Sequence, residues 1–353
     1  MLVSALTVGD YGQYAMAFSA SGIVVGLIDN AFLVRSIRVS DRAFERERRT
    51  RSGFALVLTV LGFACFQFNY VLGFSILIAG GEIALNALKS GYLRGGRIQR
   101  VMQLDLVRQG VSIAAGGTYL LVASSPNMEF ASLCYGAAYL VAVGLACFRY
   151  GVRFGGLPGR VRESTLLSFG AVAGAGYAQG DVLLLGVVAG DNAAGVYSIA
   201  SMVAWAAAGL FLNHANSYVA EIRSGGSGAS LKSILLPAAL VAASVAGLSL
   251  VIWFLDVMNP LGPSLLVLSA FVFLRAINHV CTVMLTLAKR DVTRTSATVV
   301  TALFDIGLVF LLADIGSVGA AVAAVVSELL LLSVYAPAYK KSVKAPRVSL
   351  GVS

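Results

Sequence analysis

The chain has 353 residues, of which 58% are apolar and only 12% are charged. A globular domain carries about 25% charged residues, so this composition excludes a soluble protein and indicates a polytopic membrane protein. The bilayer core is about 30 Å thick and needs about 20 apolar residues per helix. The chain can therefore hold about a dozen spans and has no room for a soluble domain.

The net charge of +9 has two explanations. One is a nucleic-acid partner; the other, which we favour, is membrane topology, because Lys and Arg collect in cytoplasmic loops. The four cysteines fall inside apolar stretches without CxxC spacing, and the chain has two histidines. The sequence therefore predicts no disulfide framework, no metal site, no cofactor and no nucleic-acid partner.

Apolar stretches of helix length recur along the whole chain, which predicts an all-α fold. We place eleven spans, each boundary uncertain by about 2 to 4 residues. They lie at residues 12–34, 53–69, 72–93, 104–124, 130–148, 165–189, 194–218, 233–255, 264–288, 295–313 and 317–338.

Charge alternates between successive connections. Of the 26 basic residues, all but Lys89, Arg108 and Arg275 lie in one set of connections and the tail, at 35–51, 94–100, 149–162, 223–232, 289–294 and 340–347. The opposite set contains acids but no bases: Asp10, Glu129, Asp191, Asp256 and Asp314. The positive-inside rule therefore places the C-terminus in the cytoplasm and the N-terminus outside.

A short motif occurs twice, as GQYAMA at residues 12–17 and as GVYSIA at 195–200. Both copies sit where a helix starts inward, which predicts two parallel repeats; chance similarity is the alternative. The predicted parts are an N-terminal lobe of five helices (1–150), a cytoplasmic linker (151–164), a C-terminal lobe of six helices (165–338) and a cytoplasmic tail (339–353). Only eleven residues precede the first motif, so a first helix is expected to be missing from the N-terminal lobe.

These features resemble a known family. The segments GDYGQYAMAFS (9–19), GYLRGGR (91–97) and QGDVLLLGVVAGDNAAGVYSIA (179–200) are similar to those of the polysaccharide flippases of the MOP superfamily, the multidrug, oligosaccharidyl-lipid and polysaccharide exporters. The resemblance covers nearly the whole chain in order. Its most specific part is DxLLLGxxxG followed by GxYxxA.

The resemblance implies a V-shaped fold of twelve helices in two lobes, here without the first helix. It implies flipping of a polyprenyl pyrophosphate-linked oligosaccharide across the bacterial cytoplasmic membrane, with membrane lipids and the substrate as partners. A polysaccharide polymerase and chain-length machinery could be further partners. In that family the first helix lines the cavity, so its true loss would put activity in doubt, whereas an overlooked upstream start would restore it.

Nine charged residues fall inside the predicted spans, where a charge costs roughly 2.5 to 3.5 kcal/mol on insertion scales. They are Asp29, Glu82, Lys89, Asp105, Arg108, Asp181, Arg275, Asp305 and Glu328. Many share a helix face with other polar residues, as do Arg275, Asn278 and His279. Such faces favour a water-filled interior over lipid.

We predict that the substrate pathway contains Arg275, Arg108, Lys89, Glu82, Asn278 and His279. Its cations suit a pyrophosphate headgroup, since Arg offers planar bidentate donors and Lys a point charge. Desolvation could make three acids bind and release protons and so couple transport to an ion gradient: Asp181, Asp305 and Glu328.

Simpler explanations exist for part of this set. Lys89, Arg108 and Asp29 lie close enough to an interface to snorkel, and Asp105 with Arg108 could pair along one helix. His279 could be a packing residue. The six glycines between residues 170 and 190 are expected to permit close backbone approach.

Three functional classes are weighed. The intramembrane set holds three bases and six acids, so a proton- or sodium-coupled antiporter of drugs or organic cations, from the same superfamily, is the alternative to the flippase. A membrane enzyme is not expected, because no catalytic constellation is visible in the sequence. An inactive remnant is raised only by the missing helix.

Overall fold

The computed structural model describes residues 6–36, 39–95, 97–217, 231–256, 259–288 and 290–344. These residues form eleven α-helices and one 3₁₀ turn, so the predicted all-α class is confirmed. Internal contacts divide the chain into two compact units, unit 1 (Met1–Gly195) and unit 2 (Val196–Ser353).

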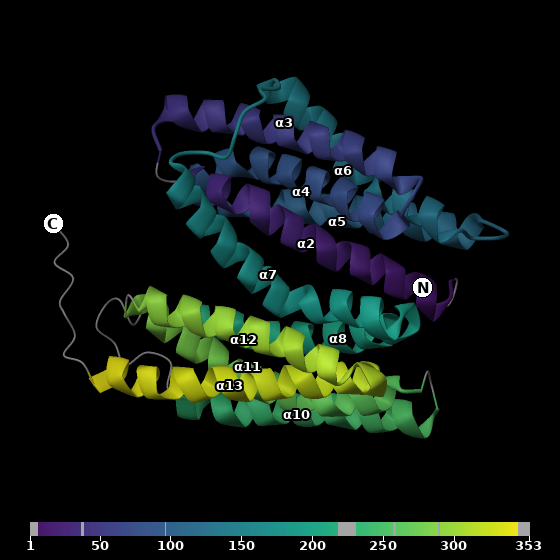
Figure 1. The fold of residues 1–353 in the computed structure, drawn as a ribbon, viewed down its shortest axis with the longest axis vertical. Coiled ribbons are helices and arrows are strands. Elements are labelled where there is room, and N and C mark those ends of the chain that lie inside the picture. Colours follow the sequence, from purple (N-terminus) through teal and green to yellow (C-terminus); the bar gives the residue numbers. More distant parts are fainter. Residues whose placement is uncertain are drawn as a thin grey trace. The chain divides into compact units, whose positions relative to one another are not determined.

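Unit 1 contains six complete helices, drawn from purple to teal in Figure 1. They are α2 (Val8–Ser36), α3 (Asp41–Phe66), α4 (Tyr70–Arg94), α5 (Ile98–Val122), α6 (Met128–Tyr150) and α7 (Val161–Ala189). Helix α8 (Asp191–Ser217) begins in unit 1 and continues in unit 2, which is completed by α10 (Leu231–Phe254), α11 (Leu261–Leu287), α12 (Asp291–Leu311), the turn η1 (Ala313–Ile315) and α13 (Ser317–Lys344).

Helix α4 is the centre of unit 1. It contacts α2, α3, α5 and α6, and its apolar side chains Phe74, Leu77, Ile78 and Ile83 are fully buried. Glycines let neighbouring helices approach it closely, because they carry no Cβ. At Gly81 a Cβ would meet the ring of Tyr139 on α6, so this glycine makes the space that Tyr139 occupies.

Helices α2 and α7 form a long antiparallel seam. Asn30 donates a side-chain hydrogen bond to the carbonyl of Leu167 (2.8 Å) near one end. At the other end Gln13 donates to Asp191 Oδ2 (2.6 Å), and a Cβ on Gly12 would collide with the carbonyl of Asp191. Contact along both helices explains why α7 clusters with unit 1, while the predicted lobe boundary at residues 151–164 stays a prediction.

Arg35, at the end of α2, forms ion pairs that link α2 to α3 and to the first turn of α7. Its guanidinium binds Glu47 on α3 (3.0 Å) and Glu163 on α7 (2.8 Å). In the connection between α6 and α7, the amide of Arg153 donates to the carbonyl of Arg49 on α3 (3.2 Å). The connection between α6 and α7 is therefore held against α2 and α3.

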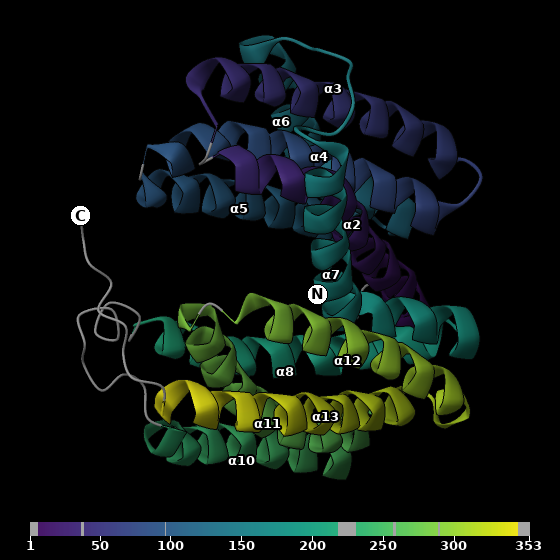
Figure 2. The same cartoon turned by 60° about the vertical axis from the view of Figure 1, so that its left-hand side comes forward.

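Unit 2 packs around α11 and α13. Figures 1 and 2 both show these two helices side by side, and α11 also contacts α10 and α12. Phe211 of α8 joins Ile234 of α10 and Val280 of α11 in one apolar cluster. Small residues of α13, such as Ala320 and Ala321, are fully buried and allow close packing.

Each of the eleven predicted spans falls on one helix, and ten helices are long and apolar enough to cross a membrane. The other is α5, where Asp105, Arg108 and Gln109 interrupt the apolar run. The prediction starts the second span at residue 53, but α3 begins at Asp41 and therefore includes Arg51. The parts of the prediction that concern residues 218–230 and 345–353 lie outside the described residues.

One packing prediction is wrong at several of its positions. Gly170, Gly174 and Gly176 of α7 have open space where a Cβ would point, so they make no close helix contact. Gly186 does face Met16, but the other close approaches along the seam come from glycines of α2, such as Gly22 and Gly26. The glycine spacing of α7 predicted close packing, whereas most of the close approaches between α2 and α7 are made at glycines of α2.

Candidate functional site

The first polar cluster lies in unit 1 and joins α4, α5 and α6. Arg108 donates from Nη1 to the hydroxyl of Tyr139 (2.6 Å) and to Gln109 (2.7 Å). The Tyr139 hydroxyl donates in turn to Glu82 Oε1 (3.2 Å). Arg108 Nη2 stands 4.0 Å from Glu82, an ion-pair distance that is too long for a hydrogen bond. We call Glu82, Arg108, Gln109 and Tyr139 the unit 1 cluster.

A cation–π contact holds Arg108 in addition to its charged and hydrogen-bonding partners. Its guanidinium carbon lies 5.1 Å from the centre of the Tyr139 ring, within cation–π range. The Arg108 side chain is 17% exposed and that of Glu82 is 25% exposed. The unit 1 cluster therefore exposes part of both its charged side chains while its tyrosine stays buried.

The second polar cluster lies in unit 2 and joins α8, α11 and α13. Arg275 Nη1 binds Glu328 Oε1 (3.0 Å), and Asn278 Nδ2 donates to Glu328 Oε2 (2.5 Å). The Arg275 guanidinium lies 4.8 Å from the ring centre of Trp205. We call Arg275, Asn278, Glu328 and Trp205 the unit 2 cluster.

Burial is unequal within the unit 2 cluster. Glu328 is fully buried, whereas the Arg275 side chain is 17% exposed. A buried carboxylate in apolar surroundings requires a compensating charge, and Arg275 supplies it. His279 follows on the same helix and is buried.

Two further acids are buried but occupy separate positions. Asp305 on α12 accepts a hydrogen bond from Ser327 Oγ of α13 (2.8 Å). Asp181 on α7 accepts one from the amide of Val182 (2.8 Å). Their predicted role in ion coupling stays a prediction.

Lys89 has a partner on the next helix. Its Nζ binds Asp105 Oδ1 (2.9 Å) and so connects α4 to α5. The alternative pairing of Asp105 with Arg108 along one helix is wrong, because Arg108 turns toward Glu82 and Tyr139 instead. Lys89, Arg108 and Glu82 thus occupy one interhelical region of unit 1, while their role in substrate passage stays a prediction.

Asp29 does not snorkel to an interface. It forms a bidentate pair with Arg51, whose Nε and Nη2 each lie 2.7 Å from a carboxylate oxygen, and both side chains are 2% exposed. Asn86 donates a further hydrogen bond to Asp29 (2.9 Å). Arg51, expected from the sequence in a basic loop, is therefore a fourth base among the membrane helices, and unlike the other three it is buried.

Three residues that pair with the predicted charges were not identified from the sequence: Tyr139 and Trp205 in the two clusters, and Arg51 beside Asp29. A signal existed for Tyr139, because Tyr135 and Tyr139 stand one turn apart in mid-span, away from the interfaces where tyrosine is enriched. A charge within a span, such as Asp29, requires a partner. Arg51, just before the predicted second span, was a candidate for that partner. We find no sequence signal that connects Trp205 to Arg275.

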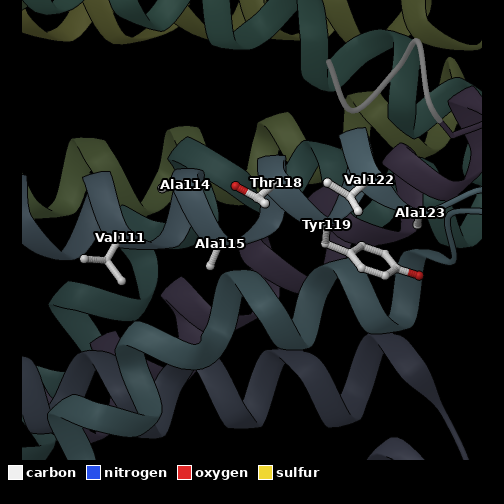
Figure 3. Close-up of a pocket in the computed structure, with 7 residues that line it drawn as sticks. All are labelled: Val111, Ala114, Ala115, Thr118, Tyr119, Val122 and Ala123. Carbon is white, nitrogen blue, oxygen red and sulfur yellow. The ribbon is translucent and has the colours of Figure 1, made fainter.

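A hollow of about 800 Å³ runs along α5. Figure 3 shows its lining side chains along one face of the helix; they are Val111, Ala114, Ala115, Thr118, Tyr119, Val122 and Ala123. Apart from the hydroxyls of Thr118 and Tyr119 this lining is apolar, so it suits hydrocarbon better than a charged headgroup. None of the predicted site residues lines it.

No group of three or more His, Cys, Asp or Glu side chains within the described residues could hold a metal ion. The two clusters instead combine one guanidinium, one carboxylate and one aromatic ring each. Such a set can exchange ionic partners, because a guanidinium paired with a carboxylate can also bind a phosphate.

The sequence matches no protein-family model, and a search of curated proteins finds no match. Solved structures do match. An inward-facing multidrug resistance MATE family transporter of the MOP superfamily is 11% identical, with a TM-score of 0.68 over 97% of this chain and 92% of that one. The chain has the fold of a MOP-superfamily transporter.

Two further solved structures agree. The lipid II flippase MurJ, in an inward closed conformation, is 12% identical with a TM-score of 0.59 over 97% of this chain and 87% of that one. An outward-facing MATE family transporter is 13% identical with a TM-score of 0.53 over 97% and 88%. Within the described residues, ten helices are long and apolar enough to cross a membrane, and with the fold they support a multi-pass membrane protein. Similarity at this identity concerns the fold alone.

Proposed function

We propose that this protein flips a polyprenyl pyrophosphate-linked oligosaccharide across the bacterial cytoplasmic membrane by alternating access, for the synthesis or export of a polysaccharide. The observation that carries the proposal is chemical likeness between the two units. Each holds a partly exposed arginine, Arg108 or Arg275, against a glutamate and an aromatic ring. Similarity in fold to the lipid II flippase MurJ supports a lipid-linked substrate.

The clusters suggest how an anionic headgroup would bind. Without substrate, each glutamate neutralises its arginine, which lowers the cost of keeping the cation in the membrane. A pyrophosphate carries more charge and more acceptor oxygens than one carboxylate, so it can replace the glutamate as the ionic partner. Arg108 is the better first contact, since its glutamate stands 4.0 Å away and makes no direct hydrogen bond to it.

A second candidate is a proton- or sodium-coupled antiporter of drugs or organic cations. The observation that favours it is the deep burial of Asp181, Asp305 and Glu328, because a buried acid can bind a proton or a cation. Proteoliposomes separate the two activities. A flippase moves a fluorescent polyprenyl diphosphate sugar without moving ethidium, whereas an antiporter moves ethidium under a proton or sodium gradient.

Arg275 provides the mutational test. Arg275→Gln should abolish complementation of a strain that lacks its polysaccharide flippase, because the substituted amide carries no charge for the pyrophosphate. It also leaves Glu328 buried without its cation, which costs about 3–5 kcal/mol of stability. The double variant Arg275→Gln/Glu328→Gln removes that penalty, so it should insert and fold normally and still fail to complement.

The exposed Arg162 supplies a matched control, since Arg162→Gln should complement fully. Normal export by the double variant would show that the Arg275–Glu328 pair is structural. Membrane insertion of every variant is followed by a C-terminal fluorescent reporter.

A further inference from the structure

Unit 1 carries a row of aromatic rings that the proposed headgroup site does not use. Tyr14 and Phe18 lie one turn apart on α2, with ring centres 5.1 Å from each other. Tyr135 of α6 meets both edge-on, at 5.9 Å from Tyr14 and 5.6 Å from Phe18. We call Tyr14, Phe18 and Tyr135 the aromatic row.

The aromatic row continues into the unit 1 cluster. The ring of Tyr135 lies 6.3 Å from that of Tyr139, one turn further along α6. Tyr139 in turn carries Arg108 over its face and Glu82 on its hydroxyl. The sequence of contacts therefore runs from a guanidinium, across Tyr139, to three further rings toward the N-terminal ends of α2 and α6.

Burial distinguishes the row from the core behind it. Phe74 and Tyr139 are fully buried, whereas Tyr14, Phe18 and Tyr135 are each only partly buried. Tyrosine in a membrane helix is enriched near the interfaces, where its hydroxyl reaches water. Partly exposed tyrosines that continue from an arginine–glutamate pair suit a wetted wall better than a lipid-facing surface.

The chemistry of the row fits a sugar. The face of an aromatic ring is negative and attracts the weakly positive C–H groups on the face of a sugar ring. Tyrosine hydroxyls, Glu82 and Gln109 can donate to or accept from sugar hydroxyls. A phosphate at Arg108 would thus have a surface for the attached glycan directly beside it.

We propose that Tyr14, Phe18 and Tyr135 form a platform that binds the first sugars of a lipid-linked glycan whose phosphate is held at Arg108. This inference rests on the proposed function and adds the site that reads the sugar. An organic cation could also stack on these rings, and the experiment below includes that outcome.

The test measures how much the sugar adds to lipid binding. Purified protein in lipid nanodiscs is titrated with undecaprenyl diphosphate and with undecaprenyl diphosphate N-acetylglucosamine, and binding is read by native mass spectrometry. The wild type should bind the glycosylated lipid about three- to tenfold more tightly, the range that corresponds to one aromatic contact.

Variants then test whether the rings cause the difference in affinity between the glycosylated and the unglycosylated lipid. Tyr135→Leu and Tyr14→Leu should bring the ratio close to one and leave affinity for undecaprenyl diphosphate unchanged, whereas Tyr135→Phe, which keeps the ring, should retain it. Arg108→Gln should weaken both lipids and preserve the ratio. Phe130→Leu is the matched control, because Phe130 is an exposed ring of α6 outside the row and its loss should change neither lipid.

Three outcomes would overturn the platform. Equal weakening of both lipids by Tyr135→Leu would make the ring a support for Arg108, and an unchanged ratio would leave it without a role in sugar binding. Loss of tetraphenylphosphonium binding with the ratio intact would assign the rings to organic cations. If Tyr135→Leu does not fold, Tyr14→Leu at the other end of the row decides. Failure of the wild type to bind either lipid would instead refute the proposed function.

Discussion

Four bases of the membrane helices, Arg51, Lys89, Arg108 and Arg275, each have an acid beside them on another helix. Arg51 binds Asp29, Lys89 binds Asp105, and Arg275 binds Glu328, while Arg108 faces Glu82 at a longer distance. Pairing lowers the cost of burying each charge, since an isolated ion in hydrocarbon is strongly disfavoured. The bases differ in solvent exposure. Only a partly exposed base can exchange its carboxylate partner for a group of a ligand.

The Asp29–Arg51 pair is the one we expect to be purely structural, because both side chains are 2% exposed. Asp29→Asn should destabilise unit 1 by about 3–5 kcal/mol, since it leaves the Arg51 guanidinium buried without its counter-charge. The measurement is the free energy of unfolding in detergent micelles from a denaturant titration.

Two companion variants sharpen this prediction. Asp29→Leu with Arg51→Met removes both charges and should recover most of the lost stability. Glu45→Ala breaks a surface pair with Arg48 and should cost less than about 1 kcal/mol. A single Asp29→Asn variant as stable as the wild type would show that the pair contributes nothing.

Sequence spacing predicted which charged residues lie in spans and which share a helix face, and the structure brings several of them together. Glu82 and Arg108 meet between α4 and α5, and Arg275, Asn278 and Glu328 meet between α11 and α13. Partners on different helices could not be read, because periodicity describes one helix at a time. Trp205 was missed for the same reason, whereas the mid-span position of Tyr139 was a signal that went unused.

At the scale of elements, the seam between α2 and α7 shows what small residues do in a membrane protein. No hydrophobic force drives two apolar helices together in lipid, so close packing of backbones has to provide the attraction. Gly12, Gly22 and Gly26 of α2 each meet atoms of α7 or the residues after it. The seam is therefore a closely packed part of unit 1.

Two glycine substitutions should therefore change stability in opposite directions. Gly12→Ala puts a Cβ against the backbone of Asp191, which cannot move aside, and should destabilise by about 1–3 kcal/mol. Gly174→Ala fills open space inside α7 and should stabilise by up to about 1 kcal/mol. Thermal unfolding in detergent, followed by helical circular dichroism, measures both. Equal effects would mean that the seam does not exist as described.

Helix positions were predictable because most spans are long apolar runs, and each predicted span falls on one of the helices in the described residues. The starts of helices were less predictable. Helix α3 continues through a basic stretch to Asp41, since Arg48 packs on the ring of Tyr150 and Arg51 is neutralised by Asp29. Tertiary contacts thus extend a helix where composition alone suggested a loop.

At the scale of the whole molecule, the two units have similar site chemistry, which the proposed alternating-access mechanism would use. Each unit has its own arginine, glutamate and aromatic ring. In the proposed mechanism one cluster could hold the headgroup while the other cluster becomes open to the opposite side of the membrane. The placement differs, because Arg108 lies on α5 with its glutamate on α4, whereas Arg275 lies on α11 with its glutamate on α13.

The order of events in this proposal depends on topology, which can be tested directly. In a variant without the four native cysteines, single cysteines replace Ser125, Asp314 or Gly156, all of which are exposed. The positive-inside rule puts Ser125 and Asp314 outside and Gly156 in the cytoplasm. A membrane-impermeant maleimide should label the first two in intact cells and Gly156→Cys only after permeabilisation.

The reverse labelling pattern would place the basic connections outside. Lys89 and Arg108 lie in the halves of α4 and α5 that adjoin a basic connection, so a reversed chain would offer its cations first to the external face. A polyprenyl pyrophosphate-linked glycan made in the cytoplasm would then meet these two cations only after it had crossed the membrane. Labelling in the predicted orientation is therefore a requirement of the flippase mechanism, whereas the fold and the two polar clusters hold in either orientation.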